Sequence, residues 1–353
     1  MTELRKKALI VLSNLLFFKF IPKNSKQKFT FTAERLGEIL AGISYRYVPQ
    51  KKKDGSVRDC YEPNEDLKEL QQAILRSILH YIPVHESLCG FVPEIAMKNG
   101  VNKHLRGSRI SNWIVKVDIK DFFPSVKSNV LNDMFEDILT KPLCNYELSD
   151  PDVFFELCNV LVKFTTYKGK LTQGAPTSPY LANLVISWAG VADELDYYCK
   201  LRETHRLLLS IYADDITISS ATGNRISVKD IIACIEKGGI FKINSKKTKL
   251  NHLRHKSHNI TGMSIHAQCD SQGIEDAWIT LPKKKQKFYR GRIMRVVRFL
   301  HEGCNPNVAE HGVSINQIEG YITWIRHVCN EHIPSSLKKI IIIFENLTKD
   351  KKS

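Results

Sequence analysis

Two adjacent acids stand between two short apolar segments near the middle of the chain, and this feature most constrains the local fold. Asp214 and Asp215 follow the β-prone run 207–211 and precede the run 216–218. Short β-prone runs on both sides of a polar turn are typical of a β-hairpin. Two carboxylates at a hairpin tip repel each other unless a cation lies between them, so the pattern favours a divalent metal. An ordinary solvated Asp-Asp turn is the alternative that these residues alone leave open.

The composition is that of a globular protein with an unusually high positive charge. The 353 residues are 43% hydrophobic and 25% charged, and the formal net charge at pH 7 is +15. A chain of this length can form roughly two or three structural units. The charge excess favours a polyanionic partner, such as nucleic acid or an acidic membrane surface. A merely solvated basic surface is the alternative.

The cysteines and the N-terminal apolar run bear on the redox state of the thiols and on membrane association. The nine cysteines are scattered without a C-x-x-C pair, which excludes zinc-site spacing, and their odd number argues against a closed disulfide framework. We therefore expect reduced thiols in a cytoplasmic protein. Basic residues precede an apolar run at 8–20, as in a signal peptide, but Ser13, Asn14 and Lys19 interrupt it. The run is too short to span a bilayer, so we expect a packed amphipathic helix and no membrane partner.

A third acid follows another β-prone segment, at 113–117. This run would deliver Asp118 to the end of a strand, where ligands commonly bind at the edge of a sheet. If this strand pairs with the hairpin, three carboxylates converge on a site for two divalent ions. Such ions activate an attacking hydroxyl and stabilise a leaving pyrophosphate. An acid that only caps a turn at the end of a strand is the alternative.

A turn rich in glycine and proline lies between these acids in the sequence, at 171–179, and reads Leu-Thr-Gln-Gly-Ala-Pro-Thr-Ser-Pro. Gly174 permits close approach of another backbone, and Pro176 and Pro179 stiffen the start of a helix. A rigid turn of this kind could hold a nucleotide and a template base beside a metal site. A plain loop-to-helix connection capped by Ser or Thr is the alternative.

The rest of the chain alternates helical and strand patterns and then changes character. We expect a strand pair near 248–266 and helices over 1–45, from 66 to before Pro83, over 125–165 with breaks at Pro142 and Pro151, after Pro176, and over 228–237. From Pro282 onward the sequence becomes strongly basic and helical. We therefore place a domain boundary close to residue 280.

The basic segment at 281–300 carries eight lysines and arginines and no acid. Its apolar stripe consists of Tyr289, Ile293, Val296, Val297 and Leu300, whereas Lys284, Lys287, Arg295 and Arg298 fall on other faces. The pattern predicts a helix laid along a phosphate backbone, and each neutralised phosphate should steepen the salt dependence of binding. A solvated basic helix without a partner is the alternative.

Three segments, taken in order, resemble the palm motifs of reverse transcriptases. They are Asp118 with Phe122-Phe123, the loop 173–179, and Tyr212-Ala213-Asp214-Asp215. The resemblance covers roughly residues 45–265 and implies an α+β, right-hand polymerase fold: fingers, a palm of antiparallel sheet plus helices, and a helical basic thumb. The implied domains are an N-terminal helical extension at 1–45, fingers and palm at 46–280, and an RNA-binding thumb at 281–353.

Two further segments resemble the bacterial retron type within that family. The sequence His-Asn-Ile-Thr-Gly at 258–262 sits where retron enzymes carry Val-Thr-Gly, with Ile260 in the Val position. The sequence Asn-Gly-Val-Asn-Lys-His at 99–104 resembles their Asn-Ala-x-x-His element, with Gly for Ala and one extra residue before the histidine. The roles of Asn99 and His104 stay open at this point. The compact length, without nuclease, RNase H or maturase segments, also suits a retron enzyme.

The resemblance implies the metal site and the gate for the sugar. Asp118, Asp214 and Asp215 would be catalytic and would bind two Mg²⁺ ions, with the Ile119 carbonyl as an additional ligand. Phe123 falls at the position where an aromatic ring would clash with a ribose 2′-OH and favour deoxynucleotides. An ordinary core phenylalanine is the alternative for that residue.

The resemblance also implies the contacts to nucleotide and nucleic acid. Lys52, Lys53 and Arg58 resemble the triphosphate clamp of the fingers, where arginine suits bidentate phosphate contact. Gln173 and Gly174 would line the nucleotide and template pocket. Lys247 would protonate the leaving pyrophosphate, with Lys249 as its competitor. The thumb residues that would bind nucleic acid are Lys284, Lys287, Arg295 and Arg298.

The function implied is that of a retron reverse transcriptase, an RNA-directed DNA polymerase. It would bind a structured noncoding RNA encoded beside it, prime from a guanosine 2′-OH, and build branched, multicopy single-stranded DNA from dNTPs. Such systems commonly act in antiphage defence with an accessory effector protein. One alternative is another bacterial reverse transcriptase, either group II intron-like or a defence enzyme without the retron RNA. The other is a non-catalytic RNA-binding scaffold, against which the presence of all three acids argues.

Overall fold

The computed structural model describes residues 2–17, 31–52, 55–105, 113–143, 150–202, 204, 206–220, 224–252, 258–269, 275–303 and 313–349. Its α-helices are α1 Glu3–Phe17, α2 Ala33–Ala41, α3 Glu65–Ser77, α4 Met97–Lys103, α5 Phe122–Ser125, α6 Ser128–Leu143, α7 Pro151–Thr165, α8 Ser178–Trp188, α9 Val191–Lys200, α10 Val228–Glu236, α11 Lys283–His301, α12 Ile315–Cys329 and α13 Ser335–Lys349, and η1 Leu79–Tyr81 is a 3₁₀ helix. Its strands are β1 Tyr45–Tyr47, β2 Gln50–Lys51, β3 Val57–Arg58, β4 Tyr61–Pro63, β5 Trp113–Asp118, β6 Leu207–Tyr212, β7 Asp215–Ser220, β8 Lys249–His252, β9 His258–Ile260, β10 Met263–Cys269 and β11 Glu275–Thr280.

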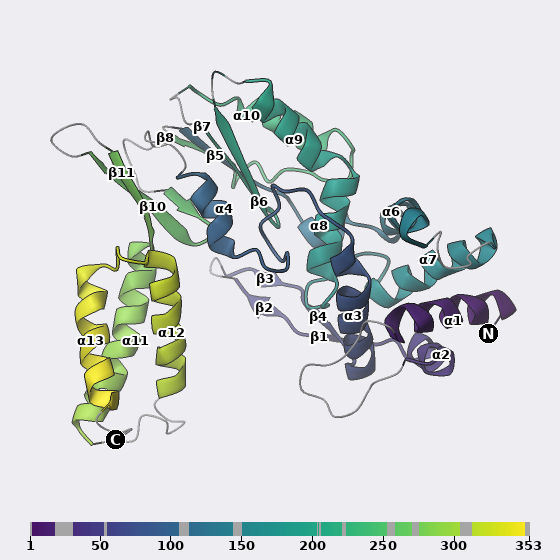
Figure 1. Cartoon of the computed structure of the whole chain (residues 1–353), viewed down its shortest axis with the longest axis horizontal. Helices are drawn as coiled ribbons and strands as arrows, with labels where there is room; N and C mark the ends of the chain where they lie inside the picture. The colour runs from purple at the N-terminus through teal and green to yellow at the C-terminus, as the bar shows by residue number, and fades with distance from the viewer. Residues whose placement is uncertain are drawn as a thin grey trace.

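A four-stranded antiparallel sheet, in the order β6-β7-β5-β8, organises the middle of the chain (Figure 1). Strands β6 and β7 form the hairpin that the sequence predicts, and β5 pairs with β7. Alternation along the strands places Ile211, Ile216 and Ile218 on one face, where they are almost fully buried. These side chains belong to the same core as the apolar residues of α8, α9 and α10. The opposite face carries Asp118 and Asp215 at one end.

The same core extends to the N-terminal helices. Leu9, Leu12 and Leu16 of α1 are buried, and α1 lies beside α7 (Figure 1). The packed amphipathic helix expected near the N-terminus is therefore confirmed. Helix α7 begins at Pro151, where a proline costs no hydrogen bond because the first helical N–H has no partner within the helix. In the described part of the chain, no helix combines the length and the apolar character needed to cross a membrane.

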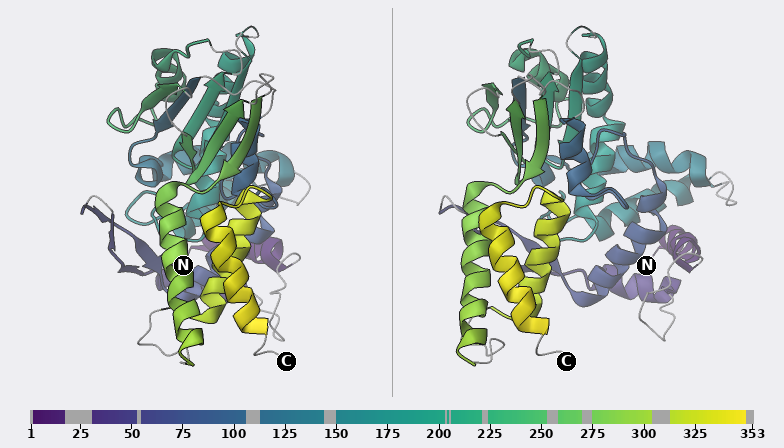
Figure 2. Two further views of the ribbon diagram at one scale, coloured as in Figure 1. Left: turned by 90° about the vertical axis from the view of Figure 1, so that its left-hand side faces the viewer. Right: turned by 60° about the vertical axis from the view of Figure 1, so that its left-hand side comes forward.

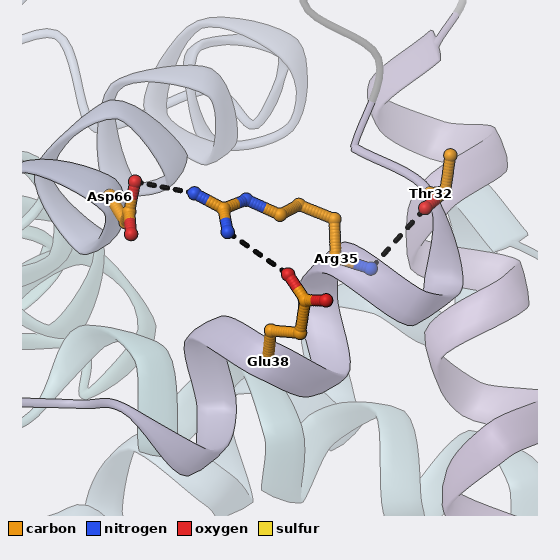
Figure 3. A network of polar contacts seen from close by, with 4 residues as sticks. All are labelled: Thr32, Arg35, Glu38 and Asp66. Atoms are coloured by element: carbon orange, nitrogen blue, oxygen red, sulfur yellow. Dashed lines mark hydrogen bonds and ion pairs between the residues drawn. The ribbon is translucent and has the colours of Figure 1, made fainter.

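Arg35 ties α2 to α3 at the surface of this core (Figure 3). Its backbone N–H donates to the Thr32 side chain at the N-cap of α2, at 3.3 Å. Its guanidinium donates to Glu38 at 3.0 Å and to Asp66 of α3 at 2.6 Å. Because all of these groups are exposed and screened by water, the network orients α2 more than it stabilises the fold.

A second core joins the sheet β11-β10-β9 to the helices α11, α12 and α13, which lie side by side (Figure 2). Ile293, Val296 and Leu300 of α11 are buried in it, which confirms the predicted apolar stripe. Ile260 of β9 and Ile265 of β10 belong to the same cluster. The domain boundaries given above stay predictions.

The strands near 248–266 pair differently from the single strand pair expected. Strand β8 joins the central sheet beside β5, whereas β9 and β10 form a hairpin in the other sheet. Their turn consists of Thr261 and Gly262, both with positive φ, at 46° and 80°. A two-residue turn with two positive φ values matches the twist of a hairpin, which explains this local pairing.

Two small hairpin-like pairings precede the central sheet. Strand β1 pairs with β4, and β2 pairs with β3. The β2–β3 ribbon extends away from the neighbouring helices in the left view of Figure 2, and its residues are exposed. Arg58 of this ribbon and Lys52, which directly follows β2, are two of the basic residues predicted to contact a triphosphate.

Candidate active site

The hairpin tip and the end of β5 bring the backbones of the three predicted acids to one corner of the sheet. Residues 213 and 214 form the two-residue turn between β6 and β7, and Ala213 has φ of 52°. A positive φ is uncommon outside glycine but suits the first position of a tight hairpin turn. The pairing of β5 with β7 places Asp118 opposite Asp215. The Ile119 N–H donates to the Asp214 carbonyl at 2.9 Å, so the three acids share one corner of the sheet.

Lys247 is held at the same corner. The Asn244 N–H donates to the Asp118 carbonyl at 2.8 Å, and the Lys247 N–H donates to the Asn244 carbonyl at 3.0 Å. The resulting turn brings Lys247 Nζ to 2.9 Å from Asp118 Oδ2. This hydrogen bond, together with the charges of the three acids, raises the pKa of Lys247. Lys249, the other candidate for the same role, is exposed on β8 opposite Lys116, two residues before Asp118 along β5.

The electrostatics of the corner favour a bound cation. Asp118 is buried, with 8% of its surface exposed, and Asp214 and Asp215 are half-buried. Burial raises the pKa of Asp214, and the neighbouring charges of Asp215 and Asp118 raise it further. Three carboxylates supply the hard oxygen ligands that Mg²⁺ prefers, so the residue types fit such an ion. Within the described ranges, however, no three acidic, His or Cys side chains converge as they would around a metal.

The two phenylalanines after Asp118 have different environments. Asp121 adopts the left-handed conformation, with φ of 47°, and starts the short helix α5. Phe122 is buried and stacks on Phe241, with 5.9 Å between ring centroids. Phe123 is half-buried and packs at the margin of the core. Phe122 is therefore the core residue, and Phe123 is the one partly accessible from the surface.

The loop at 173–176 is tied to the first strands. The Tyr61 N–H donates to the Gln173 carbonyl at 2.7 Å, and Cys60 and Gln173 form an isolated parallel bridge. Gly174 has φ of 106°, and a Cβ built there would lie only 2.7 Å from the Tyr61 carbonyl oxygen. Glycine is required at this position both by the backbone conformation and by the space.

A segment that the sequence interpretation passed over lies against the hairpin tip. The Cys89 N–H donates to the Ile211 carbonyl at 2.8 Å, which adds this segment to the edge of β6. A Cβ at Gly90 would lie 3.1 Å from the Tyr212 ring and from the Ala213 nitrogen. The Phe91 ring contacts Tyr212, at 5.6 Å between centroids. No spacing or charge pattern distinguishes this segment in the sequence, and its position depends on β6.

Other predicted residues lie apart from the acids. Arg58 lies on β3 of the exposed ribbon and Lys52 directly follows β2, and this ribbon is a sheet separate from the one that carries the acids. Lys53 lies outside the described residues. The predicted nucleic-acid contacts on α11 are all exposed, on faces away from its buried stripe: Lys284, Lys287, Arg295 and Arg298.

Comparison with known proteins gives the class to which this fold and site belong. The family model described as "Reverse transcriptase (RNA-dependent DNA polymerase)" matches residues 50–288. The chain therefore belongs to the reverse transcriptase family, and it is an RNA-directed DNA polymerase. The match, together with the described helices and antiparallel sheets, confirms the α+β polymerase fold predicted above.

The relatives define the type within the family. The Retron Ec86 reverse transcriptase of Escherichia coli is 30% identical over 240 residues, which are 66% of this chain and 68% of the relative. The Retron Ec73 reverse transcriptase of Escherichia coli is 30% identical over 286 residues, 78% of this chain and 81% of the relative. The Retron Mx65 reverse transcriptase of Myxococcus xanthus is 28% identical over 228 residues, which are 61% of this chain and 49% of the relative. The chain is thus a reverse transcriptase of the retron type.

One solved structure is similar over a comparable part of the chain. It is apo telomerase from Candida tropicalis, truncated from the C-terminal domain, with 14% sequence identity and a TM-score of 0.42. The similarity covers 71% of this chain and 62% of the telomerase chain.

Proposed function

We propose that Asp118, Asp214 and Asp215 form the catalytic centre of this polymerase and hold two Mg²⁺ ions. The observation that carries the proposal is the pairing of Asp118 with Asp215, with Ile119 hydrogen-bonded to the Asp214 backbone, in a chain of the reverse transcriptase family. Two ions at such a site activate the attacking hydroxyl and stabilise the leaving pyrophosphate. The carbonyl of Ile119, adjacent to Asp118, supplies a further oxygen ligand.

The neighbouring residues select and orient the nucleotide. The half-buried Phe123 ring lies five residues beyond Asp118 and would exclude a ribose 2′-OH. Lys247, whose Nζ is hydrogen-bonded to Asp118, is protonated at neutral pH like any ordinary lysine, and it donates a proton to the leaving pyrophosphate. Gln173 and Gly174 line the nucleotide and template pocket from the loop bonded to Tyr61. Arg58 of the β2–β3 ribbon and Lys52, which follows β2, contact the triphosphate together with Lys53.

We further propose that the template and primer are one structured noncoding RNA, as the resemblance to retron reverse transcriptases implies. The enzyme would prime from a guanosine 2′-OH of that RNA and extend it with dNTPs into branched, multicopy single-stranded DNA. The exposed cations of α11 would neutralise phosphates of the bound nucleic acid. The system would act in the cytoplasm, in antiphage defence with an accessory effector protein.

The metal site is tested by Asp214→Asn, with Asp152→Asn as the matched control. Asp152 is an exposed acid in the first turn of α7, outside the proposed site. The Asp214 variant should lose Mg²⁺-dependent primer extension and keep RNA binding, whereas the Asp152 variant should keep both. Equal extension by wild type and the Asp214 variant would refute the metal assignment.

The RNA partner is tested by sequencing the nucleic acid that copurifies with the protein expressed from its native locus. A noncoding RNA from the neighbouring gene, joined through a 2′–5′ linkage to DNA, is the expected result. Recovery of unbranched DNA alone would contradict priming from a 2′-OH. Recovery of unrelated RNA would favour a reverse transcriptase without a dedicated retron RNA.

A further inference from the structure

His104 is a buried histidine that the site described above does not use. It directly follows α4, and 2% of its surface is exposed. Its Nε2 lies 2.7 Å from Ser210 Oγ on β6, and its Nδ1 lies 2.7 Å from Ser219 Oγ on β7. One imidazole ring therefore bridges the two strands of the hairpin that carries Asp214 and Asp215.

The bridge is diagonal across the hairpin and lies on the face of the catalytic acids. Ser210 pairs with Thr217, and Ser219 pairs with Leu208. Each serine is therefore two residues along the strand from the position opposite the other serine. Alternation places both serines on the same face as Asp215. A slip of either strand by one residue would turn one serine to the opposite face and break the bridge.

Burial keeps the bridging ring neutral. Burial, with a smaller effect from Lys103, lowers the pKa of His104 to about 3. A neutral imidazole donates from one nitrogen and accepts at the other, and each serine hydroxyl can take the complementary role. Both ring nitrogens are thus satisfied without a charge in the core.

The helix that carries His104 is fixed at two further points. Gly100 packs so closely that a Cβ there would lie 3.0 Å from Cys89 Cβ and 3.7 Å from Ser210 Cβ. At the other end of α4, Lys98 Nζ donates to the His327 carbonyl at 2.7 Å and to Asn330 Oδ1 at 2.9 Å, near the C-terminus of α12. Contacts at both Lys98 and Gly100 therefore hold α4, and with it the following His104, against the hairpin.

We propose that His104 is a positioning residue of the polymerase, which locks the register and tilt of β6 against β7 and so holds Asp214 and Asp215 in place. The inference rests on the proposed catalytic function of those acids. The alternative is a histidine that only satisfies polar groups in the core and has no effect on the rate of the chemical step.

Three variants separate these alternatives. His104→Phe removes the bridge but leaves two buried hydroxyls unsatisfied, which can destabilise the fold. Ser210→Ala combined with Ser219→Ala removes the partners. The triple variant combines His104→Phe, Ser210→Ala and Ser219→Ala. It removes all the polar groups of the bridge together, which costs less stability than leaving some of them unpaired. His80→Phe is the matched control, because His80 is a partly buried ring packed edge-on against Tyr180, away from the hairpin.

The readout is the rate of single-nucleotide addition per active enzyme, with the active fraction taken from the burst amplitude. The triple variant should add a nucleotide about ten- to a hundredfold more slowly, the range expected for a small misplacement of catalytic groups. Its Mg²⁺ midpoint should shift to higher concentration, whereas its KM for dNTP should change by less than about twofold. His80→Phe should match wild type in all three quantities.

A triple variant with the wild-type rate per active enzyme and the wild-type Mg²⁺ midpoint would overturn the inference. A loss confined to the active fraction or the melting temperature would also overturn it, because that is the result of a purely structural role. Asp214→Asn is measured in parallel. If that variant extends primers normally, the proposed function fails; if it is inactive while the triple variant is normal, only the positioning role fails.

Discussion

Substitution of Gly174 by alanine tests whether the loop at 173–176 must lie in close contact with Tyr61 of β4. The new Cβ would lie 2.7 Å from the Tyr61 carbonyl oxygen, in a backbone with φ of 106°. An unfavourable φ for a non-glycine residue costs about 1–3 kcal/mol. The overlap adds to this cost, because the loop must withdraw and weaken the Tyr61–Gln173 hydrogen bond, worth about 1 kcal/mol.

Gly190→Ala is the control, because it also places an alanine at a positive φ but without the overlap. Gly190 has φ of 71°, and a Cβ there meets no atom within 4 Å. Urea denaturation should show that Gly174→Ala loses about 1 kcal/mol or more beyond the loss in Gly190→Ala. Primer extension should show a raised KM for dNTP only for the Gly174 variant, since the withdrawn loop displaces Gln173. Equal stability losses with an unchanged KM would refute the reasoning.

Three further predictions follow from the site and the buried histidine. Phe123→Val should lower the preference for dNTP over NTP by about 10- to 100-fold in competitive extension, whereas Phe122→Leu should lower stability and leave the preference unchanged. Lys247→Met should slow single-turnover addition by about a hundredfold or more, and Lys249→Met should leave it near the wild-type rate. His104 has a folded pKa of about 3, below its unfolded value, so its contribution to stability is complete above about pH 6.5 and declines as the pH falls toward 3. Urea titrations should show that the free energy of unfolding of wild type falls between pH 7 and pH 5. For the triple variant His104→Phe, Ser210→Ala, Ser219→Ala this fall should be about 2 kcal/mol smaller.

Local patterns predicted several elements because short-range chemistry determines them. The two short β-prone runs on either side of Asp214 and Asp215 indicated the hairpin, and the spacing of Ile293, Val296 and Leu300 indicated the buried stripe of α11. The ordered motifs indicated the polymerase family. The hairpin and the stripe need only a contiguous run or a periodicity, and the family needs only the order of three short motifs, so none of these inferences depends on knowing which distant segments are in contact.

Local sequence was thus enough for the central hairpin, the apolar stripe of α11, the family and the residue types of the candidate site. Only the tertiary structure decided that Asp118 lies opposite Asp215, that Lys247 and not Lys249 reaches Asp118, and that His104 bridges both strands of the hairpin. These facts depend on which strands pair and in which register. Strand pairing between distant segments is selected by the packing of the whole core, and no local pattern of residues encodes it.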